Sequence, residues 1–137
     1  MERILVSVDD SERAEAVVRQ AAALALAFDA DLEVVHAVLV PTRIRSATAA
    51  GDPDGVDERQ AIAEQAAAKA RTFGAPRVTH RVVTGDVGPA ICAAAEEGDA
   101  DLIVLGSRGH GPVMGAILGS VTQHVTAHAP CSVLVAR

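Results

Sequence analysis

The sequence predicts an α/β fold: a single-domain, doubly wound, five-stranded parallel sheet in the order 3-2-1-4-5, with helices on both faces. Three observations lead to this prediction. The chain has 137 residues, which is the size of one domain. Five short β-branched runs alternate strictly with helical patterns, as parallel strands joined by right-handed crossovers require. Four of these runs are almost continuously apolar, which is typical of strands buried on both faces.

The expected strands are the runs richest in Val, Ile and Leu, at 4–8, 32–38, 78–83, 102–105 and 132–135. The third run differs from the others because Thr79, His80 and Arg81 interrupt its apolar residues. A strand of mixed polarity fits a position with less cover, so we expect the third strand at an edge of the sheet.

Helical spacing of apolar residues fills the intervals between these runs. Ser11 is the expected N-cap of a first helix that reaches Phe28, with Glu12 in its opening turn. The other helices are expected from 57 to 73 with a face mostly of Ala, from 88 to 98, and from about 118 to just before Pro130. The stretch 41–56 has little periodicity and predicts a flexible loop before the second helix.

Composition and charge exclude several classes of function. The chain carries 12 basic and 18 acidic residues, a net charge of −6 with no basic stripe, so a nucleic-acid partner is not expected. Cys92 and Cys131 stand alone, which fits reduced thiols that pack as small hydrophobes. The chain shows no signal peptide and no apolar run long enough to span a bilayer, so we expect a cytoplasmic protein without a membrane partner.

The strand order places a ligand crevice between the first and fourth strands, where the order reverses. The segments that follow these strands are 9–11 and 106–111, and the second begins a run of closely spaced glycines. Glycine allows close approach of a ligand and positive φ, and successive amides together with a helix N-terminus favour phosphate. A tight turn with close helix–sheet packing explains the glycines equally well at this point.

Other phosphate and metal motifs are missing or incomplete. The chain has no Walker A pattern, and its first strand–helix turn has no glycine for a dinucleotide fingerprint. The pair Asp9–Asp10 is also found in phosphotransfer receivers, but residues 83–85 at the end of the third strand supply no acceptor Asp and residues 136–137 supply no Lys. His124 and His128 have a metal-compatible spacing, yet no third ligand is evident, so we expect no metal site on protein side chains.

The sequence resembles the universal stress protein family along essentially its whole length. The family's ATP-binding signature is a glycine, two residues, a glycine, nine residues, and a glycine followed by Ser or Thr. Gly106, Gly109, Gly119 and Ser120 match this signature in full. The segments 4–11, 34–38, 101–109 and 129–135 are also similar to family segments and follow in the same order. Family members without the glycine signature generally do not bind ATP, so the resemblance implies the binding subclass.

The resemblance also implies roles for individual residues. Asp9 contacts the ribose, Ser7 and Val8 line the adjacent wall, and the backbone of Ala37 reads the adenine. The phosphate-side set is drawn from the turn after the fourth strand and the start of the last helix: Gly106, Ser107, Arg108, Gly109, His110, Gly111, Gly119, Ser120 and Val121. Mg²⁺ or Mn²⁺ would accompany ATP and be held mainly by phosphate oxygens. Family members often have proline in place of Ser7 and a larger aliphatic residue in place of Ala37.

These expectations point to a regulatory or stress-response protein that binds ATP. The resemblance further implies a homodimer formed through the last strand at the sheet edge, where 133–135 is apolar. Two alternatives stay open: a dimeric interaction module of the same fold that binds no nucleotide, and an ATPase. No convincing catalytic base is present beyond His110, so we expect no enzyme, or at most slow hydrolysis.

Overall fold

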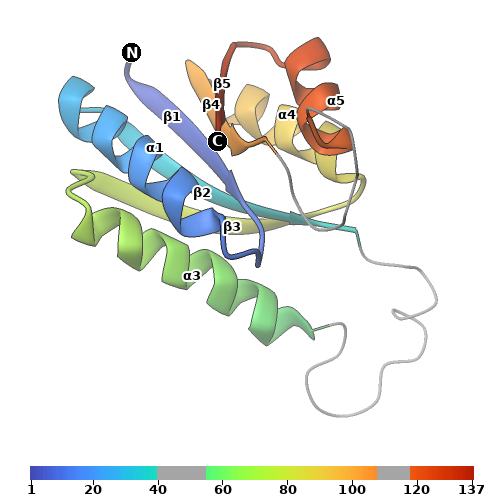
Figure 1. Ribbon diagram of the computed structural model, residues 1–137, viewed down its shortest axis with the longest axis horizontal. Helices are drawn as coiled ribbons and strands as arrows, with labels where there is room; N and C mark the ends of the chain where they lie inside the picture. The colour runs from blue at the N-terminus through green and yellow to red at the C-terminus, as the bar shows by residue number, and fades with distance from the viewer. Residues whose placement is uncertain (40–54, 108–117) are drawn as a thin grey trace.

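One five-stranded parallel sheet organises the protein. The computed structural model describes residues 1–39, 55–107 and 118–137 (Figure 1). The strands are β1 (Arg3–Val8), β2 (Asp31–Val38), β3 (Arg77–Thr84), β4 (Leu102–Gly106) and β5 (Ser132–Ala136). Every neighbouring pair is parallel and the order is β3-β2-β1-β4-β5. The predicted topology is confirmed, and the more polar third strand lies at an edge as expected.

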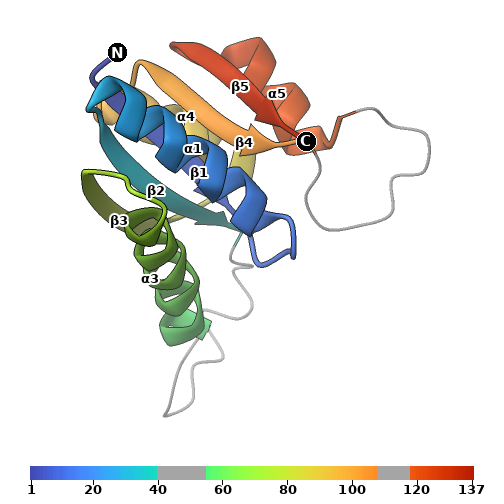
Figure 2. The same ribbon diagram turned by 60° about the vertical axis from the view of Figure 1, so that its left-hand side comes forward.

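Helices cover both faces of the sheet. They are α1 (Ala14–Phe28), α3 (Val56–Thr72), α4 (Val87–Glu97) and α5 (Ser120–His128). Helices α1 and α3 pack on one face, and α4 and α5 pack on the other (Figures 1 and 2). Each helix follows a strand and returns the chain to the starting edge, so the carboxyl ends of all strands, and the beginnings of all helices, share the opposite edge. Helix α3 begins one residue earlier than predicted, and the expected loop 41–56 lies mostly outside the described residues.

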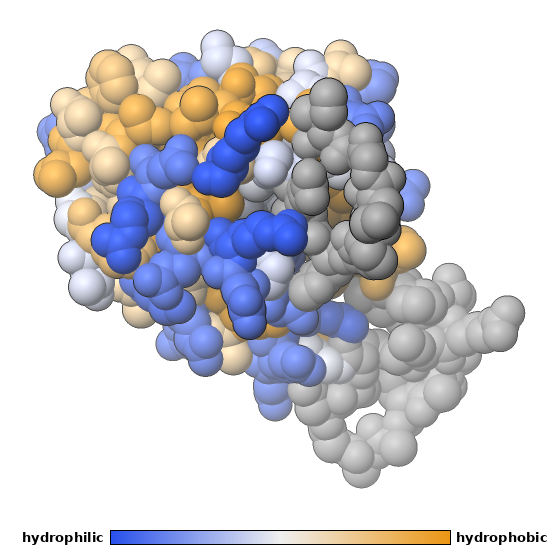
Figure 3. Space-filling view, in the orientation of Figure 1, coloured by the Kyte–Doolittle hydropathy of each residue, from blue (hydrophilic) through white to orange (hydrophobic). Residues whose placement is uncertain are grey.

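Helix cover is uneven over the surface. In Figure 3 apolar side chains gather in a band that runs from the C-terminal end of α1 to β5. Leu26 and Phe28 of α1 are exposed, and Leu134 of the edge strand β5 is half-buried. The first helix ends at Phe28 as the sequence pattern predicted, but this last apolar residue of the pattern is exposed. Asp29 adopts the left-handed conformation, ends α1, and turns the chain so that Ala30 is buried instead.

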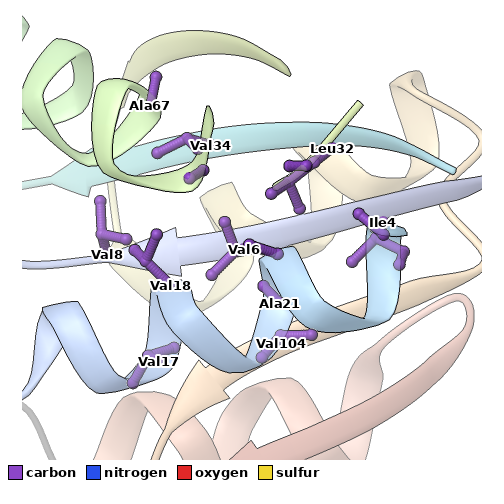
Figure 4. Packing of buried hydrophobic residues seen from close by; sticks show 14 of the residues in the cluster. Ile4, Val6, Val8, Val17, Val18, Ala21, Leu32, Val34, Ala67 and Val104 are labelled. Carbon is purple, nitrogen blue, oxygen red and sulfur yellow. The ribbon is translucent and has the colours of Figure 1, made fainter. Parts of the chain in front are cut away.

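Aliphatic residues alone build the two core layers. On the α1–α3 side, β1 contributes Ile4, Val6 and Val8, which pack against Val18 of α1 (Figure 4). Fully buried alanines on α1 and α3, at 21, 25, 67 and 70, let the helices approach the sheet and each other closely. Layers of this kind bury both faces of every central strand, which is the condition for a stable parallel sheet.

The first helix starts later than expected because a carboxylate organises the turn before it. Helix α1 begins at Ala14, and its N-cap Arg13 makes no side-chain capping bond. Ser11 is therefore not the cap. Its backbone N–H donates to Asp9 Oδ1 at 2.9 Å, and its carbonyl accepts the N–H of Ala14 at 3.2 Å. Asp9 thus fixes the turn by a side-chain-to-backbone bond, which is a common use of aspartate at such positions.

The cysteines and the histidine pair behave as structural residues. Cys92 and Cys131 are free and half-buried against the α4–α5 side of the core, and burial raises the pKa of both thiols. His124 and His128 stack with ring centroids 4.3 Å apart. In the ranges 1–39, 55–107 and 118–137, no cluster of three metal-ligating side chains is present, and no helix is long and apolar enough to cross a bilayer.

Gly88 makes the contact between α4 and α5 possible, and its replacement by alanine should loosen that contact. Gly88 is buried, and a Cβ at this position would lie 2.8 Å from the ring of His124. We expect Gly88→Ala to reduce the free energy of unfolding by about 1–2 kcal/mol, because overpacking outweighs the gain in helix propensity. Urea denaturation measures the change. The double variant with His124→Ala should recover most of it, and an additive result would contradict the predicted clash.

Candidate functional site

A cavity of about 650 Å³ opens at the carboxyl edge of the sheet, between β1 and β4. Small-molecule sites commonly enclose about 300–1,000 Å³, so the cavity has the size of a ligand site. Its wall combines the ends of three strands with the beginnings of four helices. The strand ends and the segments that follow them supply Ser7, Val8, Asp9, Asp10, Ser11, His36, Ala37, Val38, Leu39, Leu105 and Gly106.

A hydrogen bond joins the ends of β1 and β2, which form part of the cavity wall. Val8 and His36 are partners in the register of β1 and β2, and both are buried. The Nδ1 atom of His36 lies 2.9 Å from the carbonyl oxygen of Val8. His36 is therefore a core histidine with a hydrogen-bond partner, and its bond joins the ends of the two strands. Ala37 follows on the same wall, so the cavity has a small apolar surface beside the Asp9 carboxylate.

Helix α5 approaches the cavity with its N-terminus. Gly119 is the N-cap, and the cavity wall includes Ser120, Val121 and Thr122 of the first turn. The first amides of a helix have no acceptor within the helix, and the helix dipole gives this end positive character. The first turn of α5 therefore places donors suited to an anion at the crevice.

Hydrogen bonds fix α5 to the end of β4. The N–H of Ser107 donates to the carbonyl of Ala136 at 2.9 Å, and the N–H of Gly119 donates to the carbonyl of Ser107 at 2.8 Å. The hydroxyl of Thr122 donates to the carbonyl of Gly106 at 2.7 Å, and Thr122 is 3% exposed. These bonds join β5, β4 and α5, so the orientation of the helix N-terminus depends on the sheet.

The structure brings eight of the predicted site residues to one cavity: Ser7, Val8, Asp9, Ala37, Gly106, Gly119, Ser120 and Val121. Ser107 is not on its wall, and its amide is bonded within the protein. Gly119 has φ −68° and ψ 163°, an extended conformation that does not require glycine. Arg108, Gly109, His110 and Gly111 lie outside the described residues.

Three polar residues of the cavity wall, each in or next to the first turn of a helix, were not predicted from the sequence. Arg13 at the start of α1 and Arg59 in the first turn of α3 line the cavity, as does the buried Thr122. The available signal was topological: helices that follow the first and second strands begin at the same edge as the predicted crevice. Thr122 carried no separate signal, because a threonine on a helix commonly bonds its own helix rather than a neighbouring strand.

Fold and cavity together define a doubly wound α/β protein with a small-molecule crevice at its topological switch point. The sequence pattern of the universal stress protein family matches residues 1–137. A Thermus aquaticus relative, described as a universal stress protein in the QAH/OAS sulfhydrylase 3′ region, is 39% identical and the match covers 98% of this chain and 97% of the relative. The chain belongs to the universal stress protein family.

Solved structures show the same fold. The structure of the universal stress protein from Archaeoglobus fulgidus in complex with dAMP has a TM-score of 0.79 and 28% identity, and the match covers 100% of this chain and 98% of that one. A universal stress protein in complex with cAMP has a TM-score of 0.81 and 28% identity over 99% of this chain and 97% of that one. Both of these neighbours are complexes with adenine nucleotides.

Thr122 should hold α5 in place through its hydroxyl. In Thr122→Val the side chain keeps its shape, but the carbonyl of Gly106 loses its donor in a buried setting. We expect a loss of about 1–3 kcal/mol in the free energy of unfolding, measured by chemical denaturation. Thr122→Ser keeps the hydroxyl and is the matched control, with a smaller loss expected. A larger loss in Thr122→Ser than in Thr122→Val would show that the methyl group, and not the hydrogen bond, stabilises this contact.

Proposed function

We propose that this protein is a nucleotide-binding regulatory or stress-response protein that binds ATP in the crevice between β1 and β4. One observation carries the proposal: the cavity combines a carboxylate after β1, an apolar wall on β2 and the amide-rich start of α5. A nucleoside needs a polar partner for its ribose and an apolar surface for its base, and a phosphate needs donors. The adenine nucleotides bound by the two structural neighbours support the same ligand class.

The residues present fit each part of the ligand. Asp9 is placed to accept from ribose hydroxyls, while one of its oxygens also accepts the N–H of Ser11. The wall around Ala37 and Val38 suits the base, and the first turn of α5, with Ser120, suits phosphate. Mg²⁺ or Mn²⁺ bound with the triphosphate would neutralise part of its charge and be held chiefly by phosphate oxygens.

The proposal assigns a signalling role rather than catalysis. Fast phosphoryl transfer requires a base or a water-positioning residue and charge stabilisation at the reacting phosphate. The titratable groups of the described cavity wall are Asp9, Asp10, Arg13, His36, Glu58 and Arg59. The ring of His36 is hydrogen-bonded to the carbonyl of Val8, and Asp9 accepts the N–H of Ser11 in the turn before α1. We therefore propose at most slow hydrolysis, in a cytoplasmic protein that changes state with its nucleotide.

Replacement of Gly119 by glutamate should abolish nucleotide binding. The backbone at Gly119 accepts any L-residue, so the variant should fold, but its carboxylate would stand where phosphate is proposed to bind. Calorimetry with Mg²⁺–ATP should show heat for the wild type and none for the variant. Thr126→Glu adds the same charge near the other end of α5 and should keep binding. The proposal would be contradicted if the folded wild type gave no heat of binding at millimolar ATP. It would also be contradicted if the protein hydrolysed ATP at a rate on the order of 1 s⁻¹.

We also propose a homodimer formed through β5. This strand is the edge of the sheet next to β4, its Leu134 is half-buried, and the apolar band of the surface reaches this strand (Figure 3). An uncovered apolar edge strand favours association. Leu134→Lys should therefore shift the protein from dimer to monomer in analytical ultracentrifugation. Gln20→Lys on the exposed side of α1 adds the same charge and should leave the dimer intact. A monomeric wild type would contradict this proposal.

A further inference from the structure

The carbonyl at the end of β1 receives a hydrogen bond from a side chain of the neighbouring strand. The Nδ1 atom of His36 lies 2.9 Å from the carbonyl oxygen of Val8, and the two residues are partners in the register of β1 and β2. A carbonyl oxygen can only accept, so Nδ1 carries the proton and donates it. Both residues are buried, with 5% of His36 and 4% of Val8 exposed, so water has little access to either partner of this bond.

This bond sets the direction of the peptide group that leads into Asp9. The carbonyl of Val8 belongs to the peptide bond between Val8 and Asp9, and a peptide group is planar. A change in the direction of this carbonyl therefore moves the N–H and the Cα atom of Asp9 with it. His36 thus fixes the point from which the side chain of Asp9 starts.

A second hydrogen bond fixes the far end of the same side chain. Oδ1 of Asp9 accepts the backbone N–H of Ser11 at 2.9 Å in the turn before α1. A carboxylate has two accepting oxygens, and among the residues that the structure describes none donates to Oδ2 of Asp9. The carboxylate is therefore held through its main chain by His36 and through one oxygen by Ser11. Its other oxygen is left for a ligand in the cavity that Asp9 lines.

His36 lies on the opposite face of the sheet from the wall proposed for the base. Ala37 packs with the core on the α4–α5 side, and successive side chains of a strand alternate between the two faces. His36 therefore belongs to the α1–α3 side, to which Val34 and Val8 also contribute. From that side, its link to Asp9 is the carbonyl of Val8.

We propose that His36 is a positioning residue that makes the crevice selective for nucleotides with ribose hydroxyls. By holding the peptide before Asp9, it keeps the free carboxylate oxygen where it can accept from the sugar. A hydrogen bond depends on alignment, and a side chain that is already held at both ends need not be ordered when the ligand binds. The inference rests on the proposed nucleotide binding and adds the source of its selectivity for the sugar.

Calorimetric titration of the full-length protein with Mg²⁺–ATP and with Mg²⁺–2′,3′-dideoxy-ATP tests the inference. The wild type should bind ATP about tenfold more tightly, because a hydrogen bond to a charged group contributes at least about that factor. His36→Leu removes the donor to Val8 and should reduce this preference to less than about threefold, through weaker binding of ATP. The affinity for the dideoxy nucleotide should change by less than about twofold, because this ligand has no ribose hydroxyl to lose a partner.

Asparagine supplies the matched variant at the same position. It has nearly the shape of leucine, and its amide nitrogen can take the place of Nδ1, so His36→Asn should recover most of the preference for ATP. The longer side chain in His36→Gln brings its amide nitrogen near the place of Nε2 and should not recover it, and this variant replaces His36→Leu if the latter does not fold. Val34→Ala loosens the core on the same strand without touching the bond, and it should leave the preference unchanged.

A double variant shows whether His36 acts through Asp9. Asp9→Asn keeps an oxygen for the N–H of Ser11 but removes the charge, so it should lower the preference for ATP by itself. Addition of His36→Leu should lower the preference no further, because both changes act on the same hydrogen bond to the sugar. Independent, additive losses would overturn the inference.

The remaining outcomes separate this inference from the function on which it rests. A folded wild type that binds neither nucleotide contradicts the proposed function and the inference with it. Equal affinities of the wild type for the two nucleotides, or equal weakening of both by His36→Leu, would overturn the inference while the proposed nucleotide binding stands. Equal preferences in His36→Asn and His36→Leu would also overturn it, because the donor would then have no effect. Thermal melting without ligand shows whether each variant is folded.

Discussion

The direction of the strands is the constraint on which the rest of this structure depends. Parallel strands need crossovers that return the chain to the starting edge, so every strand ends, and every helix begins, at the same edge of the sheet. Between β1 and β4 the crossovers diverge: α1 packs on one face and α5 on the other. Because the helices that follow β1 and β4 pack on opposite faces, they leave the space between the ends of these two strands open. The 650 Å³ cavity lies in this space.

Backbone bonds give this gap a defined shape. Amides of Ser107 and Gly119, which the glycine-rich sequence suggested as free donors, are used to join β5, β4 and α5. A side chain adds to these bonds, because the Thr122 hydroxyl of α5 donates to the carbonyl of Gly106 at the end of β4. Among the described residues, the backbone donors left for an anion on this side of the cavity are those that helix geometry leaves at the first turn of α5. The amides of Ser107 and Gly119 and those of the helix terminus therefore have different roles.

The sequence predicted most of the fold because its strongest signals are local and agree with each other. Runs of β-branched residues marked each strand to within a residue or two, and Ala-rich spacing marked the helices. An error occurred where one residue took the role assigned to another, because Asp9 fixes the turn assigned to Ser11. The apolar spacing also did not show that Phe28 is exposed while Ala30 is buried. Arg13 and Arg59 were not predicted because an arginine at the start of a helix carries no pattern of its own, and only the tertiary structure shows which cations of the described chain are paired.

An acidic chain that holds a polyanion must rely on short-range donors. The net charge of −6 repels anions at long range, but salt screens such a field within about 10 Å at 0.1 M ionic strength. Inside the crevice the charge balance is set by the α5 terminus, by Arg13 and Arg59, and by the carboxylates of the same wall. Carboxylates pair with Arg3, Arg19, Lys69, Arg77 and Arg81, which lie outside the cavity wall. Arg13 and Arg59 are therefore the positively charged side chains of the described wall.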